Sequence, residues 1–462
     1  MSPPRLPWAL VGDDLAVPCV DGRERPYLSL DSAASTSALP AVARSVHEFL
    51  PWYSSVHRGA GYKSRRATEA YEAAREAALT FAGRDPDGPD TAIICRNTTE
   101  AINHLAYRLR LRRDEVVVTT VIEHHANLLP WARLCRRRFV ECEPDGTFGV
   151  DAVAEALDDG ERPRLLALSG ASNVSGWLPP VESIIEAAHE RGVPVLVDGA
   201  QMAAHVPLPT AADFVAWSGH KMYAPLGAGV LVGPRRAFAD GDPFLAGGGA
   251  VDLVDLDEVA WTEPPEREEA GSPNVVGAVA MHSAIEELGR IGWAAIADHD
   301  RRLAPRLREG LADIEGVRLL GPESTAAVLP LATFTVEGLP HALVAARLSA
   351  EFAIGVRHGC FCAHPYLVRL LGLDHAQVAA YRTAVGSGDR RLMPGAVRAS
   401  AGINTSEADI ERLLDALRAL VGGHPGPVPY RQDRHTGDYW PECDVPGWEV
   451  RGRQVGAPCA RG

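Results

Sequence analysis

Short apolar runs alternate with helix-period segments along residues 68–232. Apolar residues that recur roughly every three or four positions are typical of amphipathic helices, whereas short continuous apolar runs are typical of buried strands. Strands that alternate with helices indicate a mainly parallel sheet covered on both faces, with its ligand site at the carboxyl ends of the strands. The predicted strands are 91–96, 115–121, 164–169, 194–197, 213–217 and 228–232, and the predicted helices are 68–81, 181–191 and a segment that opens at Thr98.

The pattern changes after about residue 280, where helices are predicted at 281–291, 299–314, 375–383 and 406–421 and strands at 317–320 and 332–336. The remaining residues are rich in Pro, Gly and Trp and lack periodicity, which predicts an irregular tail that wraps the surface or is partly disordered. A chain of 462 residues is too long for one compact core. We therefore expect a large α/β domain at 41–289, a small α+β domain formed by 1–40 and 290–422, and a tail at 423–462.

Composition and charge restrict the partners of the chain. The net charge is −14 and apolar residues make up 46%, which is typical of a globular protein and argues against nucleic acid or an anionic membrane as the main partner. The first residues carry Arg5, Asp13 and Asp14 without a long apolar run, so no signal peptide is predicted and a cytoplasmic location is expected. No apolar run reaches the length that a membrane span requires. Eight sparse cysteines are expected as thiols rather than as a disulfide framework.

Two ionisable residues follow successive predicted strands. Asp198 follows 194–197, and Lys221 follows 213–217. An enzyme that uses pyridoxal 5′-phosphate (PLP) needs a carboxylate that keeps the pyridine nitrogen protonated, and a lysine that binds PLP as a Schiff base and moves protons. Either residue alone is more often a helix cap or a solvated loop lysine. Their placement together, with Ser218 and His220 nearby as phosphate ligands, favours a PLP site.

An ordered set of short motifs gives a more specific indication. In these motifs the sequence resembles the class V aminotransferase-type PLP enzymes, and most closely their group II cysteine desulfurase and selenocysteine lyase branch, from about residue 27 to 417. The resemblance implies an α/β protein with the aspartate aminotransferase-type fold of PLP enzymes (fold type I), in which a mainly parallel seven-stranded sheet forms the large domain. The motifs are LDSAAS (30–35), VHRG (56–59), RNTTEAIN (96–103), EHHANLLPW (123–131), SNVSG (172–176), VDGAQ (197–201), SGHK (218–221), AGGG (246–249), EAGSPN (269–274), VRHGCFCA (356–363) and VRAS (397–400).

The resemblance also implies a role for each matched residue. The helix that opens at Thr98 would bind the cofactor phosphate at its N-terminus. His124 would stack on the pyridine ring, although a capped or core histidine is the ordinary alternative, while Asn173 and Gln201 would reach the ring hydroxyl. Ser272 would contact the phosphate of a neighbouring subunit, which implies a homodimer with shared sites. The implied cofactor-binding residues are Thr98, Thr99, His124, Asn173, Asp198, Gln201, Ser218, His220, Lys221 and Ser272.

The last two motifs concern the substrate. Arg398 would bind the carboxylate of an amino acid substrate through a bidentate pair, the alternative being a surface salt bridge. Cys362 lies five residues after Arg357, the spacing at which this branch carries its nucleophilic cysteine. Arg357, which also faces the substrate in this prediction, and His358 would supply the positive charge that a reactive thiolate needs. The implied catalytic residues are Lys221, His124, Cys362 and Asp198.

The implied reaction is cleavage of the Cβ–S (or Cβ–Se) bond of cysteine or a related amino acid, which gives alanine and an enzyme persulfide that a sulfur-acceptor protein could receive. The sequence departs from the branch at Cys360-Phe361, where paired histidines are common, and in a long segment at 363–397. These departures leave open an aminotransferase, epimerase or C–S lyase that acts on a specialised amino acid, and a binding protein without turnover. A metal site at Cys360 and Cys362 is only weakly indicated, because no second ligand pair has suitable spacing.

Overall fold

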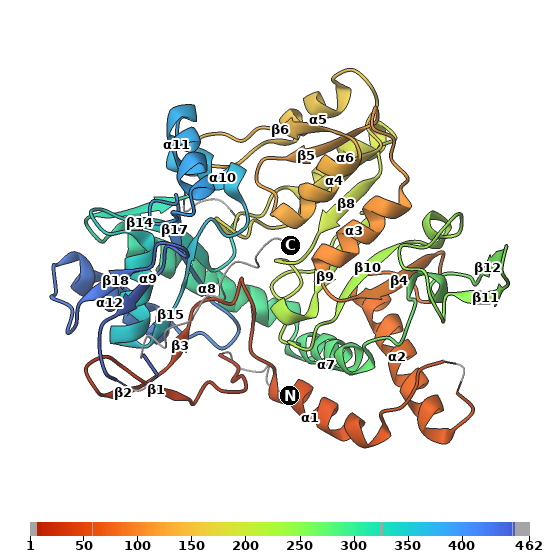
Figure 1. Ribbon diagram of the computed structural model, residues 1–462, viewed down its shortest axis with the longest axis horizontal. Coiled ribbons are helices and arrows are strands. Elements are labelled where there is room, and N and C mark those ends of the chain that lie inside the picture. Colours follow the sequence, from red (N-terminus) through yellow and green to blue (C-terminus); the bar gives the residue numbers. More distant parts are fainter. Residues whose placement is uncertain (1–6, 58, 324–326, 446, 449–462) are drawn as a thin grey trace, which may run out of the picture.

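The computed structural model describes residues 7–57, 59–323, 327–445 and 447–448. A seven-stranded sheet forms the centre of the larger half of the molecule (Figure 1), as predicted, with the strand order β4-β10-β9-β8-β7-β5-β6. Within this sheet β10 runs antiparallel to both of its neighbours, and the other pairs are parallel. Its strands are β4 (Asp90–Cys95), β5 (Val116–Thr120), β6 (Arg136–Val140), β7 (Leu165–Ser169), β8 (Val195–Asp198), β9 (Phe214–Ser218) and β10 (Gly229–Pro234).

Side chains of the central strands alternate between two cores. Leu166 and Leu168 of β7 belong to one core. Leu165 and Ala167 belong to the core on the opposite face. This alternation explains why the strands are continuously apolar, since both faces of the sheet are covered. Helices α5 (Val150–Asp158), α6 (Val181–Glu190) and α7 (Val275–Ile291) cover the first face, α3 (Thr98–Arg108) and α4 (Leu129–Leu134) cover the second, and α1 (Pro40–Phe49) and α2 (Tyr62–Phe81) pack against α7.

A second, four-stranded antiparallel sheet has the order β13-β14-β17-β16 and its own apolar core, which includes Leu307, Phe334 and Leu413. The N-terminal segment joins this part of the molecule through the parallel pairing of β3 with β15. The exact domain boundaries given above stay a prediction. The elements here are β1 (Ala16–Pro18), β2 (Glu24–Pro26), β3 (Leu28–Ser29), α8 (Trp293–Ala312), β13 (Val317–Leu320), β14 (Leu331–Val336), α9 (His341–Phe352), β15 (Ile354–Gly355), β16 (Arg357–Gly359), β17 (Ala396–Ser400) and α12 (Glu407–Val421).

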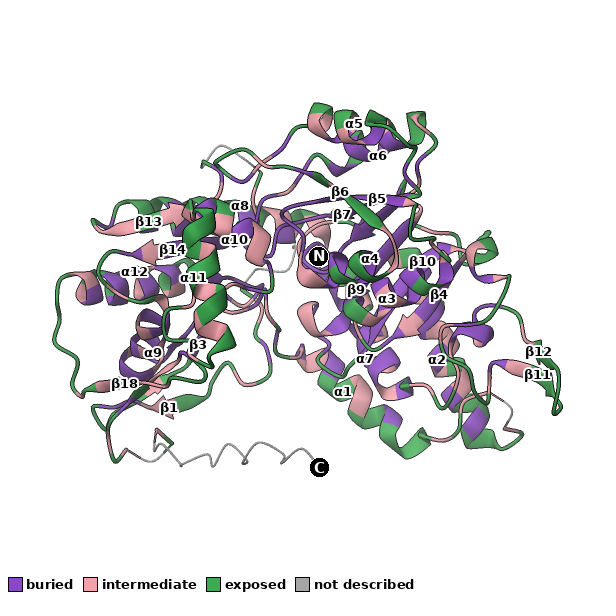
Figure 2. Ribbon diagram, turned by 45° about the horizontal axis from the view of Figure 1, so that its top comes forward, coloured by how far each residue is buried: buried purple, intermediate pink, exposed green. Residues whose placement is uncertain are grey.

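Two segments carry only weak structural signals in their sequence. The long segment between β16 and β17 forms α10 (His364–Leu371) and α11 (His375–Gly386), and α11 lies on the surface with no buried residue (Figure 2). The tail differs from the irregular structure expected of it, because β18 (Tyr430–Gln432) and β19 (Tyr439–Pro441) form an antiparallel hairpin. Tertiary contacts fix this hairpin, among them a hydrogen bond from Gln432 Nε2 to the Arg391 carbonyl (2.9 Å). Residues 449–462 of the tail lie outside the described residues.

A further antiparallel hairpin, β11 (Val251–Val254) and β12 (Val259–Trp261), projects from the larger half, with Leu253 and Leu256 exposed (Figure 1). Among the described helices, none combines the length and the apolar character that crossing a membrane requires.

Candidate active site

A cavity of about 790 Å³ lies where the carboxyl ends of β8 and β9 meet residues of the smaller sheet. Every site residue predicted from the sequence lines this cavity except Ser272. The residues that the fold brings together are Thr98, Thr99, His124, Asn173, Asp198, Gln201, Ser218, His220, Lys221, Arg357, Cys362 and Arg398.

Strand pairing places the central carboxylate and amine beside each other. Asp198 is the last residue of β8, and Lys221 ends a 3₁₀ turn (Gly219–Lys221) directly after the neighbouring strand β9. Asp198 is buried, and its Oδ1 accepts a hydrogen bond from the Ala200 amide (3.0 Å). Burial raises the pKa of this carboxyl group, while the Ala200 N–H and the charge of Lys221 oppose the shift.

The Lys221 amine is suited to act as a nucleophile. Its pKa is lowered to about 8, mainly by burial and further by the charge of Arg398, while Asp198 and Cys362 partly oppose the shift. In the described part of the chain this amine has no hydrogen bond or ion pair. A larger fraction of Lys221 is therefore neutral near pH 8 than of an ordinary lysine, and only the neutral amine can attack a carbonyl group.

The start of α3 borders the cavity with groups that can bind an anion. Asn97 caps the helix by accepting a hydrogen bond from the Glu100 amide (3.0 Å). The Thr98 amide donates to Ser218 Oγ (2.8 Å), and the Thr98 and Ser218 hydroxyl groups lie 2.6 Å apart. Hydroxyl groups at the positive end of a helix are typical of phosphate sites. His220 lies in the same lining, and burial lowers the pKa of its imidazole.

His124 is a neutral imidazole held in one orientation beside the cavity. Its pKa is lowered to about 4 by burial and by the charge of Lys221, so the imidazole is neutral near pH 7. Its Nδ1 accepts a hydrogen bond from the Ala126 amide (3.1 Å), which fixes the ring orientation. The preceding residue, Glu123, is fully buried and accepts hydrogen bonds from both the amide and the hydroxyl group of Ser169 (2.9 and 2.6 Å), which ties the end of β5 to the end of β7.

Arg398, which also lines the cavity, is held by three neighbours. One guanidinium nitrogen donates to the Asn173 carbonyl (2.8 Å) and another to Asp31 Oδ1 (3.1 Å). The Phe361 ring lies 5.1 Å from the guanidinium carbon. Arg398 Nε is buried and has no hydrogen-bond partner within the described residues. Arg357 pairs with Arg398 in the register of β16 and β17. Its side chain is more exposed than that of Arg398, and its Nη1 lies 3.7 Å from Asp31 Oδ2, a longer ion pair than the one between Arg398 and Asp31.

The amides of Asn173 and Gln201 make protein contacts in this structure. Asn173 Nδ2 donates to the Phe361 carbonyl (2.7 Å), and Gln201 Nε2 donates to the Ala33 carbonyl (2.8 Å). Both side chains still border the cavity, so their predicted contact with a ring hydroxyl stays a prediction.

Cys362 is exposed and lines the same cavity as Lys221 and Arg398. Its carbonyl accepts a hydrogen bond from the His125 amide (2.7 Å), which holds residues 360–363 against the segment that follows β5. His358 was predicted to activate this thiol, but its Nε2 lies 3.3 Å from Asp438 Oδ1 and its Nδ1 lies 3.3 Å from Nδ1 of His341. His358 is therefore engaged mainly with the tail and with α9.

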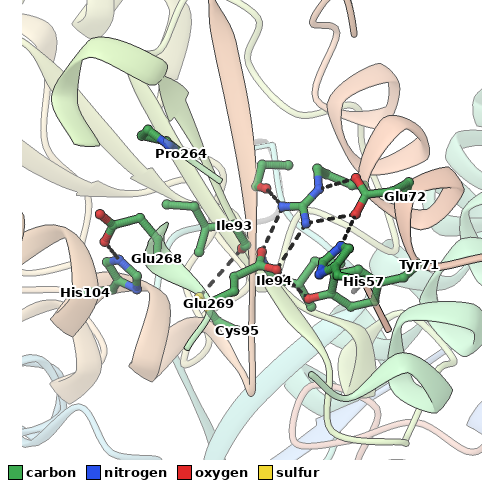
Figure 3. Close-up of polar contacts among 12 residues, drawn as sticks. His57, Tyr71, Glu72, Ile93, Ile94, Cys95, His104, Pro264, Glu268 and Glu269 are labelled. Atoms are coloured by element: carbon green, nitrogen blue, oxygen red, sulfur yellow. Dashed lines mark hydrogen bonds and ion pairs between the residues drawn. The ribbon is translucent and has the colours of Figure 1, made fainter. Parts of the chain in front are cut away.

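Ser272 is exposed and lies outside the cavity lining, and its contact with the cofactor phosphate of another subunit stays a prediction. The segment that carries Ser272 begins at Glu269, which belongs to a buried polar network (Figure 3). Glu269 accepts hydrogen bonds from Arg75 (2.9 Å), from the Tyr71 hydroxyl group (2.6 Å) and from the Ile94 amide (2.7 Å). These bonds fix the position at which the chain leaves the core towards Ser272.

Replacing Glu269 with alanine is expected to lower the free energy of unfolding by about 3–5 kcal/mol, because it leaves the Arg75 charge buried with one carboxylate fewer. Urea denaturation followed by circular dichroism measures the change. The matched control is Glu69→Ala, which removes an exposed ion pair with Arg66 (3.8 Å) and should cost less than about 1 kcal/mol. Equal effects of the two substitutions would contradict the structural role of Glu269.

Several residues at the site were not predicted as site residues. Asp31 contacts Arg398 but does not line the cavity, and it lies within the LDSAAS motif, so its place beside Arg398 could have been inferred from that match. His341, Gln432 and Asp438 line the cavity, yet they come from a helix start and from the tail, where no motif or periodicity marks them.

The set of donors and charges fits PLP. Within the described residues, Lys221 offers an unpartnered amine and Asp198 a buried carboxylate with a single hydrogen-bond donor on Oδ1. The start of α3 and the end of β9 add the hydroxyl groups of Thr98 and Ser218. His124 adds a neutral ring on the same cavity. This combination of an amine, a carboxylate, an anion site and an aromatic face matches the functional groups of the cofactor.

Comparisons with known proteins agree with this geometry. Residues 28–413 match the sequence model of the family described as aminotransferase class-V. A probable cysteine desulfurase of Pseudomonas aeruginosa is 37% identical, with 84% of this chain and 92% of that protein covered. A probable cysteine desulfurase of Vibrio cholerae is 32% identical, with coverage of 86% and 94%. The solved apo structure of the cysteine desulfurase of Thermococcus onnurineus NA1 superposes with a TM-score of 0.76 at 31% identity, and the match covers 86% of this chain and 95% of that one. This similarity confirms the predicted fold. The chain belongs to the aminotransferase class-V family.

Proposed function

We propose that this protein is a PLP-dependent cysteine desulfurase, which removes sulfur from cysteine, or selenium from selenocysteine, and leaves alanine. The observation that carries the proposal is the common cavity of Lys221, Arg398 and Cys362 in a chain that is 32–37% identical to proteins named cysteine desulfurase. An amino acid can occupy this cavity with its carboxylate at Arg398 and its side chain towards Cys362.

The cofactor would be held by residues whose chemistry matches each of its parts. Thr98, Ser218 and His220 would bind the phosphate, and Asp198 would keep the ring nitrogen protonated. Lys221 would carry the cofactor covalently. When bound, PLP withdraws electron density from the substrate Cα and so weakens bonds to that carbon and to its neighbour.

Side chains of the protein would orient the substrate, move the proton and accept the sulfur atom. Arg398 would orient the amino acid through its carboxylate, and Lys221, once released from the cofactor, would move the proton at Cα. The Cys362 thiolate would attack the substrate sulfur atom, and the electron pair of the broken Cβ–S bond would stay with the carbon. The balance is cysteine plus the Cys362 thiol giving alanine plus a Cys362 persulfide, without an external oxidant.

Three further properties belong to this proposal. Ser272 would contact the cofactor phosphate of a second subunit, so the active form would be a homodimer with shared sites. The exposed Cys362 would pass its sulfur to a thiol, which could belong to a sulfur-acceptor protein. A cytoplasmic location agrees with cysteines that the described chain holds as free thiols.

The experiment that tests the proposal identifies the products. The PLP-loaded protein is incubated with L-cysteine and a thiol reductant, and alanine, sulfide, pyruvate and keto acids are measured. We expect alanine and sulfide in equal amounts. Pyruvate with sulfide would instead indicate a C–S lyase, and keto acid formation an aminotransferase.

A further inference from the structure

The cysteine turn has an unusual backbone. The Ala363 amide donates a hydrogen bond to the Cys360 carbonyl (2.9 Å), which closes a four-residue turn. Both central residues have a positive φ, 53° at Phe361 and 55° at Cys362. Positive φ at both central positions is the mark of a type I′ turn, which usually carries Asn and Gly there because the Cβ atom of most other residues is strained in this region.

Contacts from outside the turn maintain this conformation. The Phe361 carbonyl accepts a hydrogen bond from Asn173 Nδ2 (2.7 Å), and the Cys362 carbonyl accepts one from the His125 amide (2.7 Å). The Phe361 ring is buried beside Arg398. Strained residues that their surroundings hold in place are concentrated at functional sites, which favours a functional role for the conformation of this turn.

The turn also brings two thiols together. Cys360 and Cys362 both line the cavity, Cys360 half-buried and Cys362 exposed. Residues i and i+2 of a tight turn lie roughly 5–6 Å apart at Cα, inside the range of about 4.4–6.8 Å that disulfide bonds span.

The surroundings of Cys360 support this proximity. Burial raises the pKa of the Cys360 thiol, the backbone N–H groups of Cys362 and Ala363 oppose this, and the charge of Cys362 adds to the rise. Both the backbone N–H group and the charge of Cys362 act on the Cys360 thiol, in agreement with the four-residue turn that joins the two cysteines.

We propose that Cys360 is a resolving thiol that releases sulfide from the persulfide formed on Cys362. This inference rests on the proposed desulfurase function. The Cys360 thiolate attacks Cys362 Sγ, a Cys360–Cys362 bond forms, the bond between the two sulfur atoms of the persulfide breaks, and hydrosulfide leaves with the electron pair. The outer sulfur atom is reduced to sulfide and the two cysteines are oxidised to a disulfide. A dithiol reductant then restores both thiols.

The test uses the PLP-loaded protein and one equivalent of L-cysteine per chain, without air or added thiol, followed by acid quenching, alkylation and peptide mass spectrometry. The expected result in the unmodified protein is a disulfide across Cys360 and Cys362, with about one free sulfide for each alanine. In Cys360→Ser and in Cys360→Ala the sulfur atom should remain on Cys362 as a persulfide, with little free sulfide. Cys135→Ser, which removes a comparable half-buried thiol outside the cavity, should behave like the unmodified protein.

The measurement of alanine distinguishes failure of the resolving role from failure of the proposed desulfurase function. If alanine forms and the unmodified protein keeps its persulfide as fully as Cys360→Ser, the resolving role is wrong while the desulfurase proposal stands. If neither protein forms alanine, the proposed function itself fails. A readout independent of turnover is diamide oxidation without substrate, which should link Cys360 to Cys362. Full alkylation of both cysteines after diamide would also overturn the inference.

Discussion

Substituting alanine for Lys221 is expected to abolish covalent cofactor binding, and turnover of cysteine is expected to fall by at least about 10²–10⁴-fold from lost proton transfer alone. The structural reason is that Lys221 supplies the amine at the ends of β8 and β9, and that burial keeps its pKa at about 8, where the neutral nucleophilic form is available. The measurements are the visible absorbance of the protein after gel filtration, and alanine formation.

The chain offers a precise control for this substitution, because Lys63 is its only other lysine. Lys63 is exposed in the first turn of α2 and does not line the cavity. Lys63→Ala should therefore retain the absorbance and the activity. Borohydride treatment should attach the cofactor to the Lys221 peptide alone, and a reduced adduct in Lys221→Ala would show that the lysine assignment is wrong.

The large sheet could be predicted because its strands are buried on both faces. Short apolar runs that end in or precede a polar residue, such as LLALS in β7, are typical of strands buried on both faces, and the polar residue at the end of such a run lies at the edge of the sheet. This logic located Asp198 and Lys221. It missed β6, because an edge strand with the sequence RRRFV has no apolar run and Arg-rich edges are typical of exposed strands.

The rest of the site depends on contacts between distant segments. Phe361 and Cys362 adopt positive φ values that their residue types disfavour, so local preference predicts the wrong turn. The conformation is supplied by Asn173 and His125, both from the larger half of the chain. The hairpin at residues 430–441 likewise has strands of three residues each, too short for a periodic signal, and is fixed by contacts with residues 389–393 and α9.

Replacing Cys362 with serine is expected to reduce alanine formation from cysteine by at least about 10³-fold, the scale on which loss of a covalent nucleophile lowers turnover. The Cys362 side chain is exposed and, within the described residues, forms no hydrogen bond, so the exchange of sulfur for oxygen should leave the turn and the cofactor site intact. A serine hydroxyl group has a far higher pKa than a thiol and cannot form a persulfide. The loss should therefore be confined to sulfur transfer.

Two measurements distinguish this result from simple damage to the site. The visible absorbance of the cofactor should be retained, and its change on adding cysteine should persist, because Lys221 and Arg398 still bind the amino acid. Cys135→Ser serves as the control for removing a thiol elsewhere and should keep full activity. Full activity of Cys362→Ser on the true substrate would show that the reaction does not use this thiol. The same cavity would then serve an aminotransferase, an epimerase or a C–S lyase, which need Lys221 and Asp198 but no cysteine.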